Sequence, residues 1–270
     1  MIGQVNLLND IDRIINRFPR FSIITGPKGS GKKTLCKVIT NKLGITPLYF
    51  GIKIEDIRNA IEMAYTQVQP IAFVIPDADR MSIGAKNSLL KITEEPPKNC
   101  YFIMTLESLD NTLDTIKSRG TIFKLDPYNE QELLEYRAYR GYSSNFDNII
   151  TMVCNNTGEV DELYSYNVDE FFSFANCVTD NIHIPNNGNT FKITKKIKTK
   201  QDDNTCYEAS LLLKAIQKLY LKKAKETKDK KYLNASICTS KWGQQLNLPS
   251  VNKIGIMDMW IMDVRRILRG

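Results

Sequence analysis

Short apolar runs alternate with helical patterns through the first 125 residues, and this alternation limits the folds open to the chain. Most of the apolar runs are continuous, which is typical of parallel strands covered on both faces. Strands are predicted over 21–25, 47–50, 71–75, 101–105 and 121–124, and helices over 32–43, 54–65, 82–94 and 109–118. The sequence therefore predicts an α/β fold, a doubly wound parallel sheet with helices on its faces.

From residue 126 onward the strand pattern fades and helical patterns predominate. Helices are predicted over 130–139, 146–154, 160–166, 169–178, 207–225 and 253–268, and the turn-rich residues 182–189 are predicted to form a loop. Two of these helices carry apolar stripes: Leu212, Ile216 and Leu219 in one, and Met257, Trp260, Ile261 and Val264 in the other. Such stripes bury in their own domain or against a partner, and both alternatives stay open.

Positive charge is concentrated in this helical half. Residues 191–232 hold 13 lysines and 5 acidic residues, a local charge of +8 in a chain whose net charge is +7. A region this basic indicates contact with a polyanion such as nucleic acid, or equally a solvated lysine face.

Cysteine, histidine and hydropathy patterns exclude several classes of protein. The 6 cysteines are dispersed without a C-x-x-C pair, and His183 is the single histidine. We expect reduced thiols and no zinc site, because neither a disulfide framework nor a zinc motif is present. The apolar runs are short and the first residues lack the pattern of a secretion signal, so we expect a cytoplasmic protein without a membrane segment.

A glycine-rich loop lies between the first predicted strand and the first helix. It follows the pattern G-x-x-x-x-G-K and reads Gly26, Pro27, Lys28, Gly29, Ser30, Gly31, Lys32, Lys33, Thr34. Glycines in such a loop allow backbone N–H groups to converge on phosphate, the following helix adds its positive end, and the lysine reaches the outer phosphates. The loop is predicted to bind ATP or ADP.

Two positions around this loop depart from a hydrolytic P-loop. Lys33 stands where a Ser or Thr would bind Mg²⁺, so a cation replaces a metal ligand. Pro76 stands where the first acid after the 71–75 strand is expected, which leaves Asp77 and Asp79. These acids either serve a nucleotide site or cap the following helix or the turn before it. We therefore predict weak nucleotide binding and no efficient magnesium-assisted hydrolysis.

Residues 87–97 fit N-x-L-L-K-x-x-E-E-P-P, and Ser118-Arg119-Gly120 follows the next predicted strand. Together with 51–58 and the opening Ile2-Gly3-Gln4, these segments resemble the AAA+ clamp-loader subunits, chiefly the delta-prime type of DNA polymerase III, or gamma and tau, of bacterial or phage origin. The resemblance implies an AAA+ core over 1–125, a three-helix lid over 126–167 and a helical collar over 168–270. The zinc module usual in bacterial gamma and delta-prime subunits is missing.

The resemblance also implies roles for particular residues. Arg119 would act in trans as an arginine finger in a neighbour's ATP site, where arginine's fixed charge and planar fork suit phosphate. The alternative is a surface arginine paired with a local carboxylate. The lid arginine of the family's G-x-x-R pattern is replaced by Asp161, within Gly158-Glu159-Val160-Asp161. Asp77 would be the remaining catalytic acid, and Lys86 the best candidate for contact with DNA phosphates.

The resemblance predicts a non-hydrolysing member of a pentameric clamp-loader ring, which would act with a sliding clamp and primer–template DNA. An active ATPase motor subunit remains the alternative, with Thr34 or Asp77 compensating for Lys33. An unrelated P-loop kinase or transport ATPase would have no reason to contain the 87–97 pattern.

Overall fold

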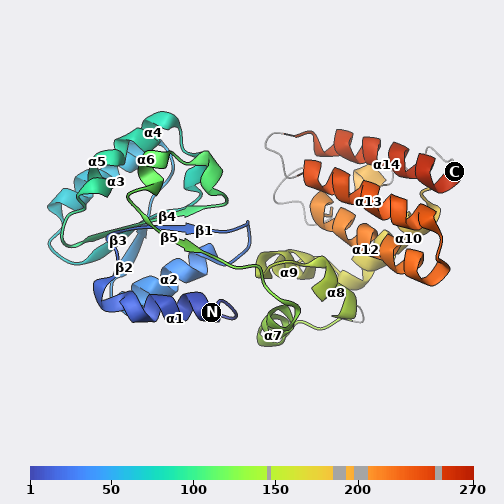
Figure 1. Ribbon diagram of the computed structural model, residues 1–270, viewed down its shortest axis with the longest axis horizontal. Helices are drawn as coiled ribbons and strands as arrows, with labels where there is room; N and C mark the ends of the chain where they lie inside the picture. Colours follow the sequence, from blue (N-terminus) through green and yellow to red (C-terminus); the bar gives the residue numbers. More distant parts are fainter. Residues whose placement is uncertain (145–146, 185–192, 198–205, 247–250) are drawn as a thin grey trace. The chain divides into compact units, whose positions relative to one another are not determined.

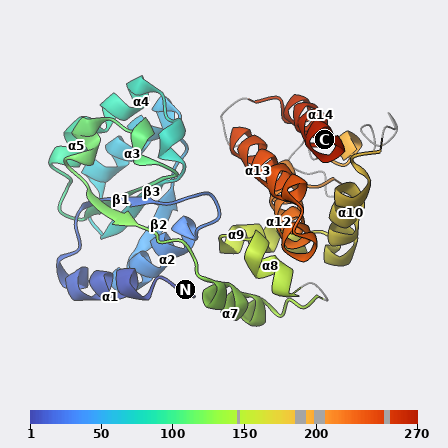
Figure 2. The ribbon, with the colours of Figure 1, turned by 45° about the vertical axis from the view of Figure 1, so that its right-hand side comes forward.

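The computed structural model describes residues 1–144, 147–184, 193–197, 206–246 and 251–270. The chain divides into two compact units. The core unit holds residues 1–132 and 156–158, and the helical unit holds residues 133–155 and 159–270. Figures 1 and 2 show a sheet with helices in the core unit and mainly helices in the helical unit.

The core unit is built on a parallel sheet with the strand order β2-β3-β4-β1-β5. Its strands are β1 (Phe21–Thr25), β2 (Thr46–Tyr49), β3 (Ile71–Ile75), β4 (Cys100–Leu106) and β5 (Thr121–Lys124). Each lies within one residue of its predicted bounds. The strands β1, β3 and β4 are buried almost throughout, which explains why their sequences are continuously apolar.

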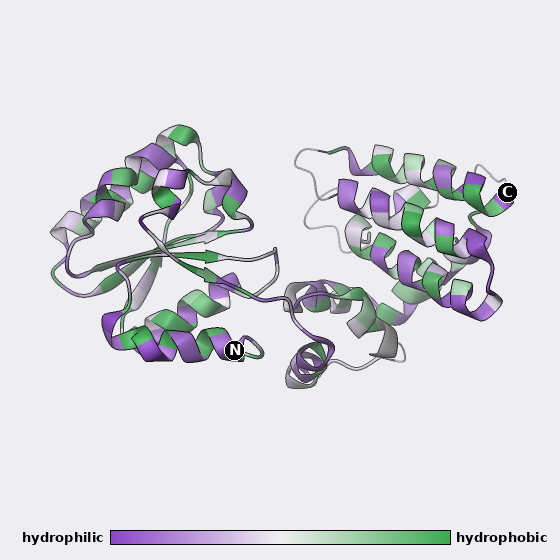
Figure 3. Cartoon of the chain, in the orientation of Figure 1, coloured by the Kyte–Doolittle hydropathy of each residue, from purple (hydrophilic) through white to green (hydrophobic). Residues whose placement is uncertain are grey.

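Helices cover both faces of the sheet and give three layers (Figure 1). One face carries α3 (Ile54–Thr66), α4 (Ile83–Ser88), α5 (Leu90–Glu94) and α6 (Asp114–Lys117), and the other carries α1 (Val5–Ile14) and α2 (Lys32–Leu43). On the first face the rings of Phe73 and Phe102 stack with centroids 5.0 Å apart. Full burial of such a side chain contributes about 1.5–3 kcal/mol, so the sheet centre holds the layers together. Figure 3 shows this apolar interior between helices of mixed hydropathy.

Three helical segments of the core unit differ from the sequence prediction. No helix was predicted at α1, whose one buried residue is Ile11. The predicted helix over 82–94 is divided into α4 and α5 at the buried Leu89, whose N–H donates to the carbonyl of Lys86 in a tighter turn. The predicted helix over 109–118 is a short turn followed by α6, because Thr112 and Leu113 adopt extended backbone.

The helical unit contains most of the remaining chain. Its helices are α7 (Glu130–Arg140), α8 (Asp147–Val153), α9 (Thr157–Tyr164), α10 (Val168–Asn181), α12 (Ala209–Thr227), α13 (Lys230–Gln245) and α14 (Lys253–Arg269), with the first turns of α7 and α9 in the core unit. Both predicted apolar stripes, on α12 and α14, are buried inside this unit. They form its own core, and the alternative of a partner-facing role for them is excluded.

The helix α13 was not predicted from the sequence. Its buried residues are the small Ala235, Ser236 and Thr239, which allow close packing but produce no apolar stripe. The preceding Asp229 begins the helix by accepting a hydrogen bond from the N–H of Lys231.

The structure confirms the predicted fold class, a parallel α/β core followed by a helical region. The finer division into lid and collar stays a prediction. Residues 185–189 of the predicted loop, and Phe146 at the start of a predicted helix, lie outside the described residues. No helix in the described ranges is both long enough and apolar enough to cross a membrane.

Candidate functional site

The glycine-rich loop connects the end of β1 to the start of α2, at the carboxyl edge of the sheet. The N–H of Gly26 donates to the carbonyl of Leu106, which ties the start of the loop to the end of β4. Gly29 and Gly31 have φ values of +81° and +93°, which residues with a Cβ rarely adopt. The loop therefore has the strand–loop–helix context of a phosphate-binding P-loop.

Lys32 turns its side chain back into this loop. Its ammonium donates to the carbonyl oxygens of Gly26, at 2.7 Å, and Pro27, at 2.9 Å. Burial lowers the pKa of Lys32 below its ordinary value, and the nearby carboxylates of Glu107 and Asp77 oppose that shift. The ammonium thus occupies the centre of the loop, bonded to backbone oxygens that a bound phosphate would replace.

The other loop residues fall into an exposed and a buried group. Pro27, Lys28, Lys33 and Thr34 are exposed. Ser30 is buried, and its hydroxyl has no hydrogen-bond partner among the described residues. A ligand phosphate is the kind of acceptor that this hydroxyl lacks.

Acidic residues follow the neighbouring strands at the same edge of the sheet. The N–H of Asp77, after β3, donates to the hydroxyl of Thr105 at 3.2 Å, and the N–H of Glu107, after β4, donates to Asp79 at 3.2 Å. The alternative that the acids cap the following helix is wrong for their side chains, because α4 is capped by Ser82. Asp77 does stand at the start of the preceding turn, Ala78–Arg80, but its side chain makes no capping hydrogen bond there. Thr105 and Glu107 were missed, although their place at the end of a buried strand was a usable signal.

Residues 156–158 pack against the tip of the loop. The carbonyl of Gly29 accepts hydrogen bonds from the N–H of Gly158, at 3.0 Å, and the hydroxyl of Thr157, at 3.1 Å. Asn156 is buried beside them, and a Cβ on Gly29 would lie 2.4 Å from its Oδ1. The tip of the loop is thus held by residues about 130 positions away, a contact that no sequence pattern indicated.

Asp161 belongs to a polar cluster inside the helical unit. Its carboxylate accepts hydrogen bonds from the hydroxyls of Tyr136, at 2.8 Å, and Tyr142, at 3.1 Å, and forms an ion pair with Arg140 at 3.2 Å. Burial, together with the hydrogen bond to Asp161, raises the pKa of Tyr136 to about 12. Asp161 therefore joins α9 to α7 and to the turn after it.

Arg119 follows α6 and is held by two neighbouring groups. Its Nε lies 3.0 Å from Oε1 of Glu94, which also contacts Nη2, and its Nη1 donates to the carbonyl of Thr115. The pairing with a local carboxylate that the sequence left open is therefore present. A role in trans is compatible with this pair and is not tested by it.

Lys86 corrects one expectation from the sequence. It was the best candidate for contact with DNA, which requires an exposed ammonium. The side chain is instead buried, with 7% of the residue exposed, and its Nζ lies 3.4 Å from the carbonyl of Asp79. Lys86 stabilises the turn after β3, and we no longer assign it to DNA.

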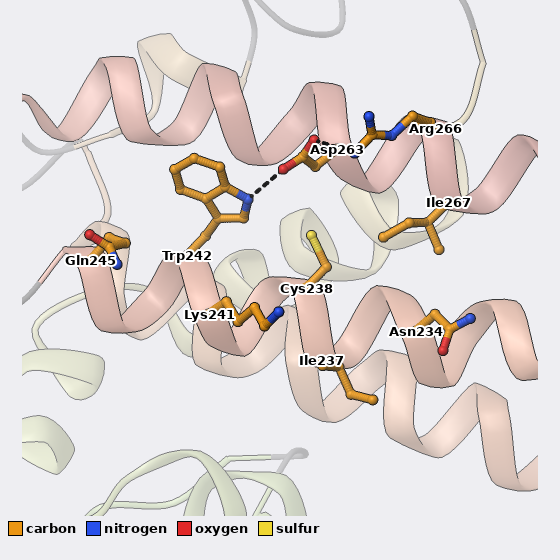
Figure 4. A pocket seen from close by; sticks show the side chains of 9 residues that line it. All are labelled: Asn234, Ile237, Cys238, Lys241, Trp242, Gln245, Asp263, Arg266 and Ile267. Carbon is orange, nitrogen blue, oxygen red and sulfur yellow. Dashed lines mark hydrogen bonds and ion pairs between the residues drawn. The ribbon is translucent and has the colours of Figure 1, made fainter.

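A surface pocket of about 680 Å³ lies between α13 and α14 in the helical unit (Figure 4). On its wall Trp242 donates through Nε1 to Asp263 at 3.1 Å, and Asp263 also pairs with Arg266 at 3.1 Å. Three of the polar side chains that line it, Trp242, Asp263 and Arg266, are thus already bonded to one another. Within the described residues, no three His, Cys, Asp or Glu side chains are grouped as metal ligands.

Comparison with known proteins relates this geometry to a family. The family model described as the delta subunit of DNA polymerase III matches residues 45–129. Over these residues the chain is similar to AAA+ clamp-loader subunits. It is 25% identical over 167 residues to subunit tau of DNA polymerase III from Bacillus subtilis strain 168, covering 50% of this chain and 30% of that protein. It is 33% identical over 91 residues to subunit delta′ of the same strain, covering 34% of this chain and 28% of that protein.

Solved structures extend the likeness beyond the core unit. A gamma-subunit-related protein of DNA polymerase III from Thermotoga maritima superposes with a TM-score of 0.56 at 14% identity, covering 96% of this chain and 99% of that one. The RuvB Holliday-junction branch-migration motor from the same organism gives 0.52 at 16% identity, covering 81% and 77%. At these identities the likeness shows a shared fold. The clamp-loader-like chain spans 30 to 50% of the length of the first curated relatives.

Proposed function

We propose that this chain is a subunit of a sliding-clamp loader in DNA replication, of the delta-prime type. It joins other clamp-loader subunits in a pentameric ring that acts on a sliding clamp and primer–template DNA. Its own nucleotide site is impaired in hydrolysis, and it gives Arg119 to the ATP site of a neighbouring subunit. The names of the matched relatives support the class of complex.

The observation that carries the proposal is the contrast between Asp161 and Arg119. The position that corresponds to the lid arginine holds a carboxylate engaged by two tyrosines and an arginine. An acid there can offer no positive charge to a phosphate. Arg119, in contrast, keeps its guanidinium at a partly exposed position, with 28% of the side chain accessible. Such a chain would support ATP hydrolysis in a neighbour's site better than in its own.

The loop Gly26–Thr34 would hold a nucleotide if one binds. A bound ATP or ADP would supply phosphate oxygens to the loop N–H groups and to the Lys32 ammonium in place of the Gly26 and Pro27 carbonyls. The donor set fits Mg²⁺ poorly, because Lys33 is a cation and Pro76 has no carboxylate. We therefore assign no step to a metal and expect weak, slowly hydrolysed nucleotide.

Arg119 suits transition-state stabilisation because a guanidinium is always charged and binds two phosphate oxygens at once. In some P-loop systems an arginine supplied in trans is worth roughly 10³-fold or more in turnover. In a ring with several sites the loss would be smaller, since other interfaces keep their own arginines.

The test is ATP turnover by the complex that co-purifies with the tagged chain, compared with the isolated chain. We expect little turnover by the isolated chain and a large loss in the complex with Arg119→Ala, while Lys32→Ala costs little. Arg119→Lys should rescue little, because ammonium lacks the planar fork. Turnover by the isolated chain equal to that of the complex, abolished by Lys32→Ala, would instead identify an active motor subunit.

A further inference from the structure

Each nitrogen of the Arg119 guanidinium has a partner in the core unit. Nε and Nη2 lie along one edge and both contact Oε1 of Glu94, the last residue of α5. Nη1 donates to the carbonyl of Thr115 in α6. The contacts come from two different helices, so they fix the plane of the group as well as its position.

Two N–H donors of the guanidinium have no partner in this arrangement. A guanidinium has five N–H donors in a fixed fork, and the contacts with Glu94 and Thr115 use three of them. The other two are one on Nη1 and one on Nη2. The structure shows no partner for them among the described residues. Donors on two nitrogens of one guanidinium can bind two phosphate oxygens at once.

We infer that Glu94 is the positioning residue for Arg119 and holds its remaining N–H donors ready for a phosphate of the neighbouring subunit. The inference rests on the proposed function of Arg119. Glu94 itself touches no substrate and acts only through the arginine.

Positioning by Glu94 lowers the entropic cost of ordering Arg119 against a phosphate. A free arginine side chain samples many rotamers. Its contact with a phosphate therefore costs the conformational entropy of those rotamers. The contact with Glu94 and Thr115 restricts the side chain before the neighbour's phosphate arrives. Only 28% of the Arg119 side chain is exposed, against 51% for Glu94, so the arginine is the more buried partner of the pair.

The neighbouring Glu95 provides a matched control. It carries the same charge, is also exposed, and has no described contact with Arg119. Replacing either glutamate therefore changes the local field similarly, but only replacement of Glu94 releases the guanidinium.

The experiment measures steady-state ATP turnover by the purified complex carrying Glu94→Ala, Glu95→Ala, Arg119→Ala or the double variant Glu94→Ala with Arg119→Ala. Gel filtration confirms that each complex assembles. We expect Glu94→Ala to lower kcat about 3- to 10-fold with KM nearly unchanged, and Glu95→Ala to have little effect. Glu94→Gln, which keeps an acceptor oxygen, should lie between wild type and Glu94→Ala.

The double variant separates positioning from a structural effect. If Glu94 acts through Arg119, the double variant should turn over no slower than Arg119→Ala alone. Equal loss from Glu94→Ala with and without Arg119 would overturn the inference, as would unchanged or faster turnover by Glu94→Ala. If Arg119→Ala itself leaves turnover unchanged, the proposed function fails and not only the role of Glu94.

Discussion

At the scale of single residues, Gly29 at the tip of the P-loop has no room for a side chain. Its φ is +81°, and a Cβ would lie 2.4 Å from Oδ1 of Asn156 and 2.9 Å from the Cα of Gly158. Gly29→Ala should therefore lower the free energy of unfolding by about 2–4 kcal/mol, from backbone strain and from the clash. Thermal unfolding followed by circular dichroism measures the loss.

Gly44 at the end of α2 is the control for this substitution. Its φ is +67°, but no atom lies within 4 Å of the position of a Cβ. Gly44→Ala should lower the free energy of unfolding only through backbone strain, by about 1–2 kcal/mol. Equal losses for the two variants would show that residues 156–158 do not pack tightly against the loop.

The sequence predicted only those site residues that lie close together along the chain. The loop from Gly26 to Thr34 is contiguous, so its glycines, its lysine and the departure at Lys33 could be recognised. The hydroxyl of Thr157 and the N–H of Gly158 reach Gly29 across about 130 residues. The burial of Lys86 likewise depends on packing around the turn after β3. Contacts between distant segments have no periodicity that a single sequence could reveal.

At the scale of elements, the Asp161 cluster joins α9 to α7. Asp161→Ala would leave the hydroxyls of Tyr136 and Tyr142 and the guanidinium of Arg140 without their shared acceptor. Because the ion pair is partly exposed, at 41% and 38%, most of the loss should come from the hydrogen bonds. We expect about 1–2 kcal/mol less stability.

Urea unfolding of the full chain measures this effect. Glu226→Ala is the control, because that carboxylate is exposed on α12 and has no described partner. Its substitution should change stability by less than about 0.5 kcal/mol. A loss for Asp161→Ala no greater than for Glu226→Ala would mean that the cluster is only a surface arrangement.

The elements that could be predicted are those whose burial leaves a pattern in the sequence. All five strands of the described residues were predicted, and for β1, β3 and β4 the reason is that burial on both faces requires continuous apolar residues. The helix α13 packs through Ala235, Ser236 and Thr239 and shows no strong apolar stripe. The helix α1 packs Leu7, Leu8, Ile11 and Ile14 against the core, so its apolar stripe was present in the sequence and was missed. The division of 82–94 at Leu89 follows from how that side chain enters the core, which helical spacing cannot indicate.

At the scale of the whole molecule, the apolar stripes that suggested partner contacts are buried in the helical unit, and other apolar side chains are exposed. On α13 these are Leu233 and Ile237, and on α14 they are Met259 and Met262, each at least 44% exposed. Under the proposed function, such side chains on the outer helices would meet neighbouring subunits, because burial of exposed apolar surface drives association.

Ile237→Asp should therefore weaken assembly while leaving the chain folded, because Ile237 is 50% exposed and contributes little to the core. A charge buried at a subunit interface should reduce recovery of the partners roughly tenfold in co-purification from cells. Asn234→Asp is the control: it lies one turn earlier on the same exposed side of α13 and adds the same negative charge. Circular dichroism of both isolated chains verifies the fold. Full recovery of partners with Ile237→Asp, or an equal loss with Asn234→Asp, would show that this face of α13 remains in solvent when the chain is assembled.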